Sequence, residues 1–251
     1  MLIGILAESI GVVATVGLAG LAVIGRALTP TAGAVAAVFG IAIVLLAGFP
    51  FLGLLVLFVG LSAGATRFKF EEKRRRGVQE GSTGERGVSN VVAHILIPTA
   101  LAVSFAAGLL DGAGVAVLYA AALAFGVSDT LASEFGVLSG KAWGILSRRP
   151  VEPGTNGGVS PVGTSFGLAG ALLTALVALP LYLVFSVPVG NPGLFLLAVA
   201  AGGFLGCHVD SILGELLENR GLLTKGGVNF CGMLSAVAIA VGILAAFGSV
   251  P

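Results

Sequence analysis

Charge is scarce in this sequence. Its 13 basic and 12 acidic residues make up 10% of 251 positions, whereas a soluble domain carries about 25% charged residues. The net charge is only +1, so the composition excludes both a soluble monomer and a nucleic-acid-binding domain with a basic face. Cysteine and histidine are also rare, with two of each, and His94 and His208 lie far apart. This excludes a disulfide framework and a zinc cluster.

Apolar residues and glycine are abundant instead. Hydrophobic residues make up 57% of the chain, and 40 residues are glycine, which allows membrane helices to approach closely. A spanning helix needs about 20 mostly apolar residues, and we expect about eight spans in a single all-α, polytopic integral membrane domain over residues 1–251. Gly48-Phe49-Pro50 predicts a tight turn between two of them. The expected spans are 2–25, 31–48, 50–66, 89–109, 112–128, 162–185, 192–209 and 228–248.

The basic residues predict the orientation. With eight spans, all thirteen of them fall on one side, which the positive-inside rule assigns to the cytoplasm, with both termini outside. The cytoplasmic side then holds a charged loop, 67–88, and two further loops, 129–161 and 210–227. Trp143 is the only tryptophan and is expected to anchor a re-entrant or surface helix over 135–147. With no transit peptide, a prokaryotic plasma membrane is the expected location.

Two motifs occur twice in the same order. Asp-hydroxyl-aliphatic-x-small-Glu ends the fifth span at 129–134 and the seventh at 210–215. Thr-x-Gly-Gly-Val-(Ser/Asn)-x-x-Gly opens the sixth span at 155–163 and the eighth at 224–232. Because spans five and seven run in the same direction, the sequence predicts a duplicated helix-loop-helix unit, spans 5–6 and 7–8, related by an axis along the membrane normal.

The first motif supplies carboxylates near the membrane surface. Such groups are costly there unless they are paired, protonated or bound to a cation, and carboxylate and hydroxyl oxygens suit Mg²⁺. We therefore expect a magnesium-dependent site. The residues expected to be catalytic and to bind the metal are Asp129, Glu134, Asp210 and Glu215.

The second motif has the character of an anion site. Adjacent glycines expose backbone N–H groups, and a helix N-terminus favours phosphate. Ser160 or Asn229 can act as an N-cap or as a ligand, and Pro161 agrees with a helix start. Asn90 and His94 can pair with each other or with a backbone carbonyl. The residues expected to bind nucleotide or phosphate are Thr155, Asn156, Gly157, Gly158, Ser160, Thr224, Lys225, Gly226, Gly227, Asn229, Arg86, Asn90 and Lys141.

These motifs resemble a family of integral membrane proteins that includes plant phytyl-phosphate kinases and archaeal members acting on geranylgeranyl phosphate. The family is more distantly similar to phytol and dolichol kinases. The matching segments are Leu28–Thr31, Ser62–Arg67, Asp129–Glu134, Pro153–Gly163, Asp210–Gly214 and Val228-Asn229. Where the family usually has Asn-Gly in the fourth span, this chain has His94-Ile95.

The resemblance implies a kinase that uses CTP or another NTP to convert an isoprenyl monophosphate, such as phytyl or geranylgeranyl phosphate, to the diphosphate. The partners would be the lipid substrate, the nucleotide and the membrane, with no nucleic acid, and the sequence is compatible with an oligomer. A transporter or channel built on the repeat is one alternative. A cytidylyl or CDP-alcohol transferase is another, although Asp111-Gly112 is not followed by the Ala-Arg typical of that group.

Overall fold

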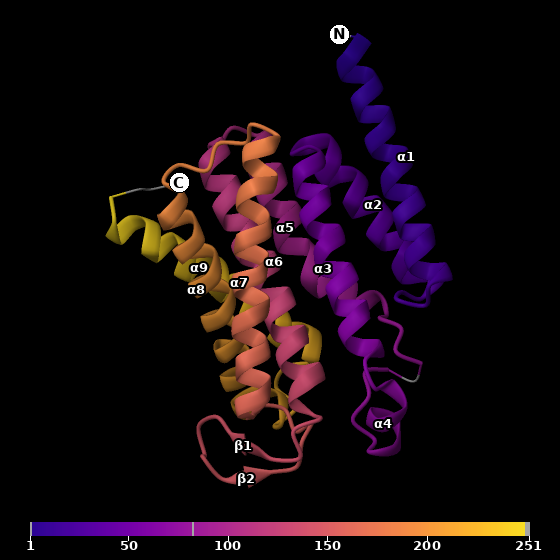
Figure 1. Ribbon diagram of the computed structural model, residues 1–251, viewed down its shortest axis with the longest axis vertical. Helices are drawn as coiled ribbons and strands as arrows, with labels where there is room; N and C mark the ends of the chain where they lie inside the picture. Colours follow the sequence, from indigo (N-terminus) through magenta and orange to yellow (C-terminus); the bar gives the residue numbers. More distant parts are fainter. Residues whose placement is uncertain (1, 82, 249–251) are drawn as a thin grey trace.

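The protein is a bundle of long helices (Figure 1). The computed structural model describes residues 2–81 and 83–248, with side chains from residue 9 onward. Eight long helices match the eight expected spans one for one. They are α1 (Leu2–Ile24), α2 (Pro30–Leu46), α3 (Phe49–Arg67), α5 (Val88–Ala106), α6 (Gly112–Gly136), α7 (Pro161–Val184), α8 (Pro192–Leu213) and α9 (Lys225–Ala246). Between them lie a short helix α4 (Phe70–Arg75) and a π-helical turn η1 (Gly214–Glu218).

Six of the described helices are long and apolar enough to cross a membrane: α3, α5, α6, α7, α8 with η1, and α9. Helix α2 is equally apolar, but its 17 residues extend about 26 Å, slightly less than a hydrocarbon core of about 30 Å. Helix α1 has 23 residues, but its side chains are described only from Ser9, and the apolar stretch Ser9–Ile24 is likewise short. The all-α polytopic bundle predicted from the sequence is confirmed.

The helix starts follow from short capping side chains. Thr29, Asp111, Ser160 and Asn191 each cap a helix by accepting a hydrogen bond from the backbone N–H three residues later. The helix start predicted at Pro161 is therefore confirmed, with Ser160 as its N-cap. The predicted turn between the second and third spans is also confirmed, because Gly48 adopts φ +96° and Pro50 lies in the first turn of α3.

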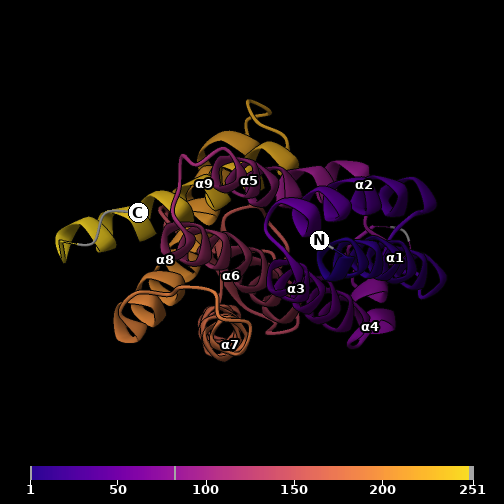
Figure 2. The same ribbon diagram turned by 90° about the horizontal axis from the view of Figure 1, so that it is seen from above.

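Helix α6 forms the centre of the bundle and is surrounded by α3, α5, α7, α8 and α9 (Figure 2). It is buried from Gly114 to Ser128. Small side chains allow this close packing. A Cβ atom on Gly203 of α8 would lie 2.6 Å from the Cβ of Ala124, so the two backbones nearly touch.

The connection between α6 and α7 is a small antiparallel sheet, whose strand order is β2-β1-β3. Its strands are β1 (Ala142–Gly144), β2 (Pro150–Val151) and β3 (Gly158–Val159). The surface helix predicted over 135–147 is wrong. The chain turns after Gly136, with Gly140 at φ +71°, and Trp143 lies in β1 opposite Pro150 and Val159.

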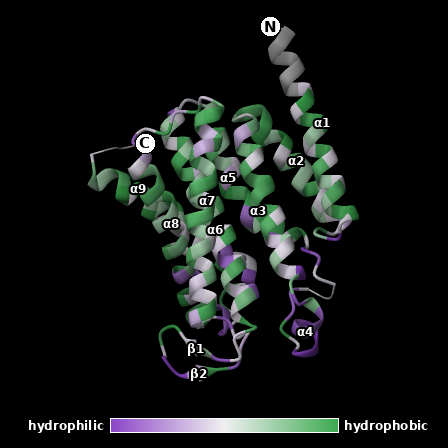
Figure 3. Ribbon diagram, viewed as in Figure 1, coloured by the Kyte–Doolittle hydropathy of each residue, from purple (hydrophilic) through white to green (hydrophobic). Residues whose placement is uncertain are grey.

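Hydrophilic residues gather at one end of the bundle (Figure 3). This end carries α4, the small sheet and η1, and lies at the bottom of Figures 1 and 3. The short α5–α6 and α7–α8 connections lie at the opposite end (Figure 1). The three loops that the sequence assigns to one side of the membrane therefore share one end of the molecule.

Candidate functional site

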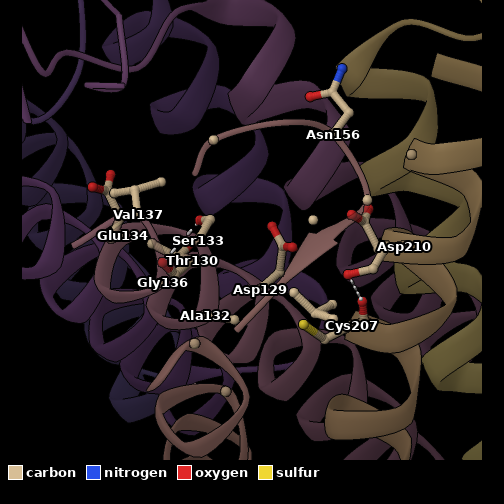
Figure 4. Close-up of a pocket in the computed structure, with 18 of the residues that line it drawn as sticks. Asp129, Thr130, Ala132, Ser133, Glu134, Gly136, Val137, Asn156, Cys207 and Asp210 are labelled. Carbon is tan, nitrogen blue, oxygen red and sulfur yellow. Dashed lines mark hydrogen bonds between the residues drawn. The ribbon is translucent and has the colours of Figure 1, made fainter. Parts of the chain in front are cut away.

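A cavity of about 500 Å³ opens among the helix ends at the hydrophilic end. Its walls come from α5, α6, α7, α8 and α9, from the chain segment 77–86, and from the turn 153–160 that precedes α7. Elements that are distant in sequence thus meet around one space (Figure 4). The cavity is large enough for a small phosphorylated ligand.

Asp129 of α6 and Asp210 of α8 both line this cavity (Figure 4). Both are partly buried. In the amide orientation that satisfies its neighbours, Asn229 of α9 donates a hydrogen bond to Asp210 Oδ2 at 3.3 Å and another to the Lys225 carbonyl at 3.2 Å. The repeated motif therefore brings one aspartate from each helical pair to the same site, where a cation would relieve their mutual repulsion.

Glu134 also lines the cavity, but it is neutralised within the protein. Lys73 of α4 is fully buried and lies 2.6 Å from Glu134 Oε2, and Thr66 donates to Oε1 at 2.6 Å. The Lys73 ammonium also donates to the Ala65 carbonyl at 2.8 Å. This carboxylate connects α3, α4 and α6, and its charge is already balanced.

Glu215 lies outside the cavity. Its two carboxylate oxygens accept hydrogen bonds from the backbone N–H groups of Leu146, at 2.8 Å, and Ser147, at 3.0 Å. It therefore fastens the β1–β2 turn to η1. The four-carboxylate cluster predicted from the sequence does not form, and no three Asp, Glu, His or Cys side chains of the described residues are grouped as a metal site. The helix ends as a π-turn at this point, with the Asn219 N–H bonded to the Gly214 carbonyl. Glu215 follows Asp210 by five residues, about 140° around an α-helix, so the two side chains leave the helix on different sides.

Two carboxylates that the sequence did not single out line the cavity. Glu218 lies at the end of η1, and Glu80 lies in the segment 77–86. Glu80 pairs with Lys225 at 2.7 Å. Burial by itself would raise the pKa of Glu80, but Lys225 and Arg86 outweigh it, so the pKa of this carboxyl lies below its usual value. Glu218 falls outside the repeated motif, and Glu80 lies in a charge run typical of a solvated linker, so neither gave a signal.

Arg86 and Lys225 supply positive charge to the cavity wall. The Arg86 guanidinium donates to Asn90 Oδ1 at 3.3 Å and to Thr130 Oγ1 at 3.4 Å. Backbone hydrogen bonds to the α1–α2 connection hold Arg86 in place, including one from its N–H to the Ala27 carbonyl at 3.0 Å. Lys141, in contrast, is exposed and is not part of the wall.

The first glycine-rich turn forms part of the wall. Its cavity-lining residues are Thr155, Asn156, Gly157, Gly158 and Ser160. Gly157 adopts φ +77° and lies against the end of α8, where an added Cβ would come within 2.5 Å of the Glu215 N atom. Only glycine allows this turn to approach so closely.

The second copy is arranged differently. Helix α9 begins at Lys225, with Thr224 as its N-cap, so Gly226 and Gly227 lie inside its first turn and not ahead of it. Of this copy, Lys225 and Asn229 line the cavity, whereas Thr224, Gly226 and Gly227 do not. A Cβ on Gly226 would meet Ser89 Oγ of α5 at 2.9 Å, so this glycine serves helix packing. Only the first copy therefore forms the expected glycine-rich anion turn, and the second copy forms the start of helix α9.

Comparison with known proteins finds relatives that are also membrane proteins. The chain is 32% identical to an uncharacterized membrane protein of Methanocaldococcus jannaschii over 194 residues, which cover 76% of this chain and 75% of the relative. It is 34% identical to an uncharacterized membrane protein of Synechocystis sp. over 189 residues, which cover 74% and 70%. The model of a family described as integral membrane protein DUF92 matches residues 13–230. No solved structure matches the chain significantly.

Proposed function

We propose that this chain, which belongs to the integral membrane protein DUF92 family, is a prenyl-phosphate kinase. The reaction would transfer the terminal phosphoryl group of CTP or another NTP to an isoprenyl monophosphate. One observation carries the proposal: Asp129 and Asp210, from the two copies of the repeat, line one polar cavity together with Arg86 and Lys225. This is a site that balances anionic and cationic groups, as phosphoryl transfer requires.

The residues present fit a magnesium ion. Mg²⁺ is usually bound by one or two carboxylates, with waters and substrate phosphates completing its shell, so Asp129 and Asp210 would be its protein ligands. Glu134 and Glu215 are engaged elsewhere. When bound, the ion would neutralise phosphate charge. The cavity residues would then position the two phosphates, because this reaction needs orientation and charge neutralisation more than covalent chemistry.

The proposed phosphoryl transfer balances in bonds made and broken, and it needs no strong base. An oxygen of the lipid monophosphate forms a new bond to the terminal phosphorus of the nucleotide, and the bond from that phosphorus to the bridging oxygen breaks. The products are the lipid diphosphate and the nucleoside diphosphate. Arg86 and Lys225 would stabilise the negative charge spread over the transferred group.

The location of the cavity also favours an enzyme over the transporter alternative. It lies at one end of the bundle, and α6 is buried from Gly114 to Ser128 beyond it. A transport path is expected instead near the bilayer midplane. We further propose that the cavity end faces the cytoplasm of a prokaryotic cell and that both termini lie outside, because all thirteen basic residues belong to that end.

The direct test uses purified protein in detergent or liposomes, labelled CTP, ATP and other nucleotides, Mg²⁺, and geranylgeranyl or phytyl phosphate. Labelled lipid diphosphate is the expected product. Absence of this product across the nucleotides and chain lengths would contradict the proposal. Ion flux through liposomes containing the protein would favour the transporter instead.

A further inference from the structure

A second, smaller cavity adjoins the polar one. It has a volume of about 50 Å³ and lies among α2, α3 and α5, with a predominantly apolar lining that includes Ala36, Phe58, Val59, Ala63 and Ile95. The two cavities share three lining residues, which are Arg86, Asn90 and His94. These three residues therefore lie between an apolar cavity and a charged cavity, and the two cavities match the two parts of an amphiphile.

His94 is the most informative residue of this wall. Its side chain is only 2% exposed, and its Nδ1 lies 2.9 Å from the Asn90 carbonyl. A carbonyl only accepts, so Nδ1 carries the proton in the neutral ring and Nε2 is left as an acceptor. Nε2 has no partner among the described residues. Phe58 stacks on the ring at 5.4 Å, which fixes its orientation.

An unpartnered buried acceptor is costly, and such atoms usually have a partner. A ligand that places an O–H group between the two cavities would donate a hydrogen bond to His94 Nε2. A phosphate monoester has such a group in its singly protonated form, since its second pKa is about 6. Arg86, on the same wall, is suited to the negative charge of that phosphate.

We propose that the smaller cavity holds the first isoprenoid unit of the lipid monophosphate and that His94 Nε2 accepts a hydrogen bond from its phosphate hydroxyl. This inference rests on the proposed function, whose substrate it places. The size is suitable. A cavity needs a volume of about 10–15 Å³ to hold one water molecule. The smaller cavity, at about 50 Å³, therefore has room for roughly one branched five-carbon unit. A single chamber of this kind accepts one chain, not the two chains of a phospholipid.

Filling the smaller cavity tests the position of the chain. Ala63→Phe places an aromatic ring in it, whereas Ala169→Phe makes the same change at an exposed position on α7. We expect the KM for geranylgeranyl phosphate to rise about tenfold or more in Ala63→Phe, with the nucleotide KM unchanged. Ala169→Phe should behave as the wild-type protein. An unchanged lipid KM in a folded Ala63→Phe protein would overturn the proposal.

Photo-crosslinking tests the same point in the unmodified protein, without turnover. The probe is a prenyl monophosphate with a diazirine on its first isoprenoid unit. We expect labels on Val59, Ala63 and Ile95, and labels confined to other surfaces would overturn the inference. If diphosphate forms while the labels lie elsewhere, only this inference fails. If no diphosphate forms with any nucleotide while these residues are labelled, the proposed function fails and the amphiphile site stands.

Two substitutions at one position test the hydrogen bond. His94→Leu removes the acceptor, whereas His94→Gln places an amide oxygen near the position of Nε2. We expect the KM for the lipid phosphate to rise about tenfold or more in His94→Leu and to stay near the wild-type value in His94→Gln, with the nucleotide KM unchanged in both. Equal lipid KM values in the two variants would remove His94 from the proposal.

Discussion

Four carboxylates in the repeated motif have three different roles at the scale of single residues. Asp129 and Asp210 line the cavity, Glu134 is balanced by a buried lysine, and Glu215 binds backbone N–H groups. The two aspartates occupy one position of the sequence pattern, and the two glutamates occupy another. Their roles differ because each depends on a partner from a distant part of the chain.

The first prediction concerns the two aspartates. Asp129→Asn or Asp210→Asn should lower the rate of the proposed phosphoryl transfer about a hundredfold or more, because each removes a negative charge that would bind the magnesium ion. The assay is formation of labelled lipid diphosphate from labelled CTP.

The matched control for the aspartates is Asp111→Asn. Asp111 caps α6 at the opposite end of the bundle, and asparagine caps helices equally well. This variant should keep its activity. Full activity in Asp129→Asn would contradict the assignment of that residue.

The second prediction concerns the buried ion pair. Lys73→Met leaves the Glu134 carboxylate buried without its partner and should lower the free energy of unfolding by about 3–5 kcal/mol. Combining it with Glu134→Gln should recover much of the loss, because no buried charge then remains. Unfolding in detergent micelles, followed by circular dichroism, measures both changes.

A surface ion pair on the same helix provides the comparison. Arg74 lies 3.6 Å from Glu71, and both side chains are exposed. Arg74→Met should therefore change stability little. If Lys73→Met were as mild as Arg74→Met, the buried pair would not hold α4 to α6.

At the scale of elements, the two halves of the repeat differ in their connections. The pairs α6–α7 and α8–α9 are both helical hairpins, but a three-stranded sheet joins the first and a π-turn joins the second. The two hairpins meet through α6 and α8, where Gly203 faces Ala124. This contact holds the helices that carry Asp129 and Asp210 at a fixed spacing.

The third prediction tests that contact. Gly203→Ala would place its Cβ 2.6 Å from the Cβ of Ala124 and 2.7 Å from that residue's carbonyl carbon. The backbone of Ala124 cannot easily move away, so the free energy of unfolding should fall by about 1–3 kcal/mol. Activity should fall as well, because α6 and α8 would be pushed apart. The same measurement on Gly60→Ala, in α3, is the control.

An added Cβ at Gly60 meets nothing within 4 Å. Gly60→Ala should therefore raise stability by up to about 1 kcal/mol through helix propensity. The same chemical change thus has opposite signs at the two positions. Equal effects would show that α6 and α8 are not in tight contact.

At the scale of the whole molecule, hydrophilic residues are concentrated at one end of the bundle. The hydrophilic end holds the large cavity, and the smaller apolar cavity adjoins it. In the proposed reaction, a nucleotide would reach the lipid phosphate between the two cavities from the water on the same side. The orientation of the bundle therefore decides which compartment supplies the nucleotide.

The fourth prediction tests the orientation with single cysteines. In a Cys207→Ala/Cys231→Ala background, Glu152→Cys marks the sheet at the hydrophilic end, and Leu109→Cys marks the other end, where Leu109 is 77% exposed. A membrane-impermeant maleimide should label Leu109→Cys on intact cells. It should label Glu152→Cys only after permeabilisation. The reverse pattern would contradict a cytoplasmic site.

The sequence by itself determined the class of fold, the number of long helices and several helix starts. These properties depend on local chemistry, namely on runs of apolar residues, on the Ser160-Pro161 start and on the Gly48–Pro50 turn. It also indicated Asp129 and Asp210, because a repeated polar motif stands out in an apolar chain. The scarcity of charge made that motif visible.

Only the tertiary structure decided which polar residues face the cavity. Lys73 reaches Glu134 across 61 positions, and the backbone of Leu146 reaches Glu215 across 69. Glu80 and Lys225, 145 positions apart, meet at the cavity wall. A sequence pattern records spacing along one helix, whereas the charge balance of a carboxylate depends on what other helices bring to it. The cavity therefore follows from helix packing, which local spacing does not specify.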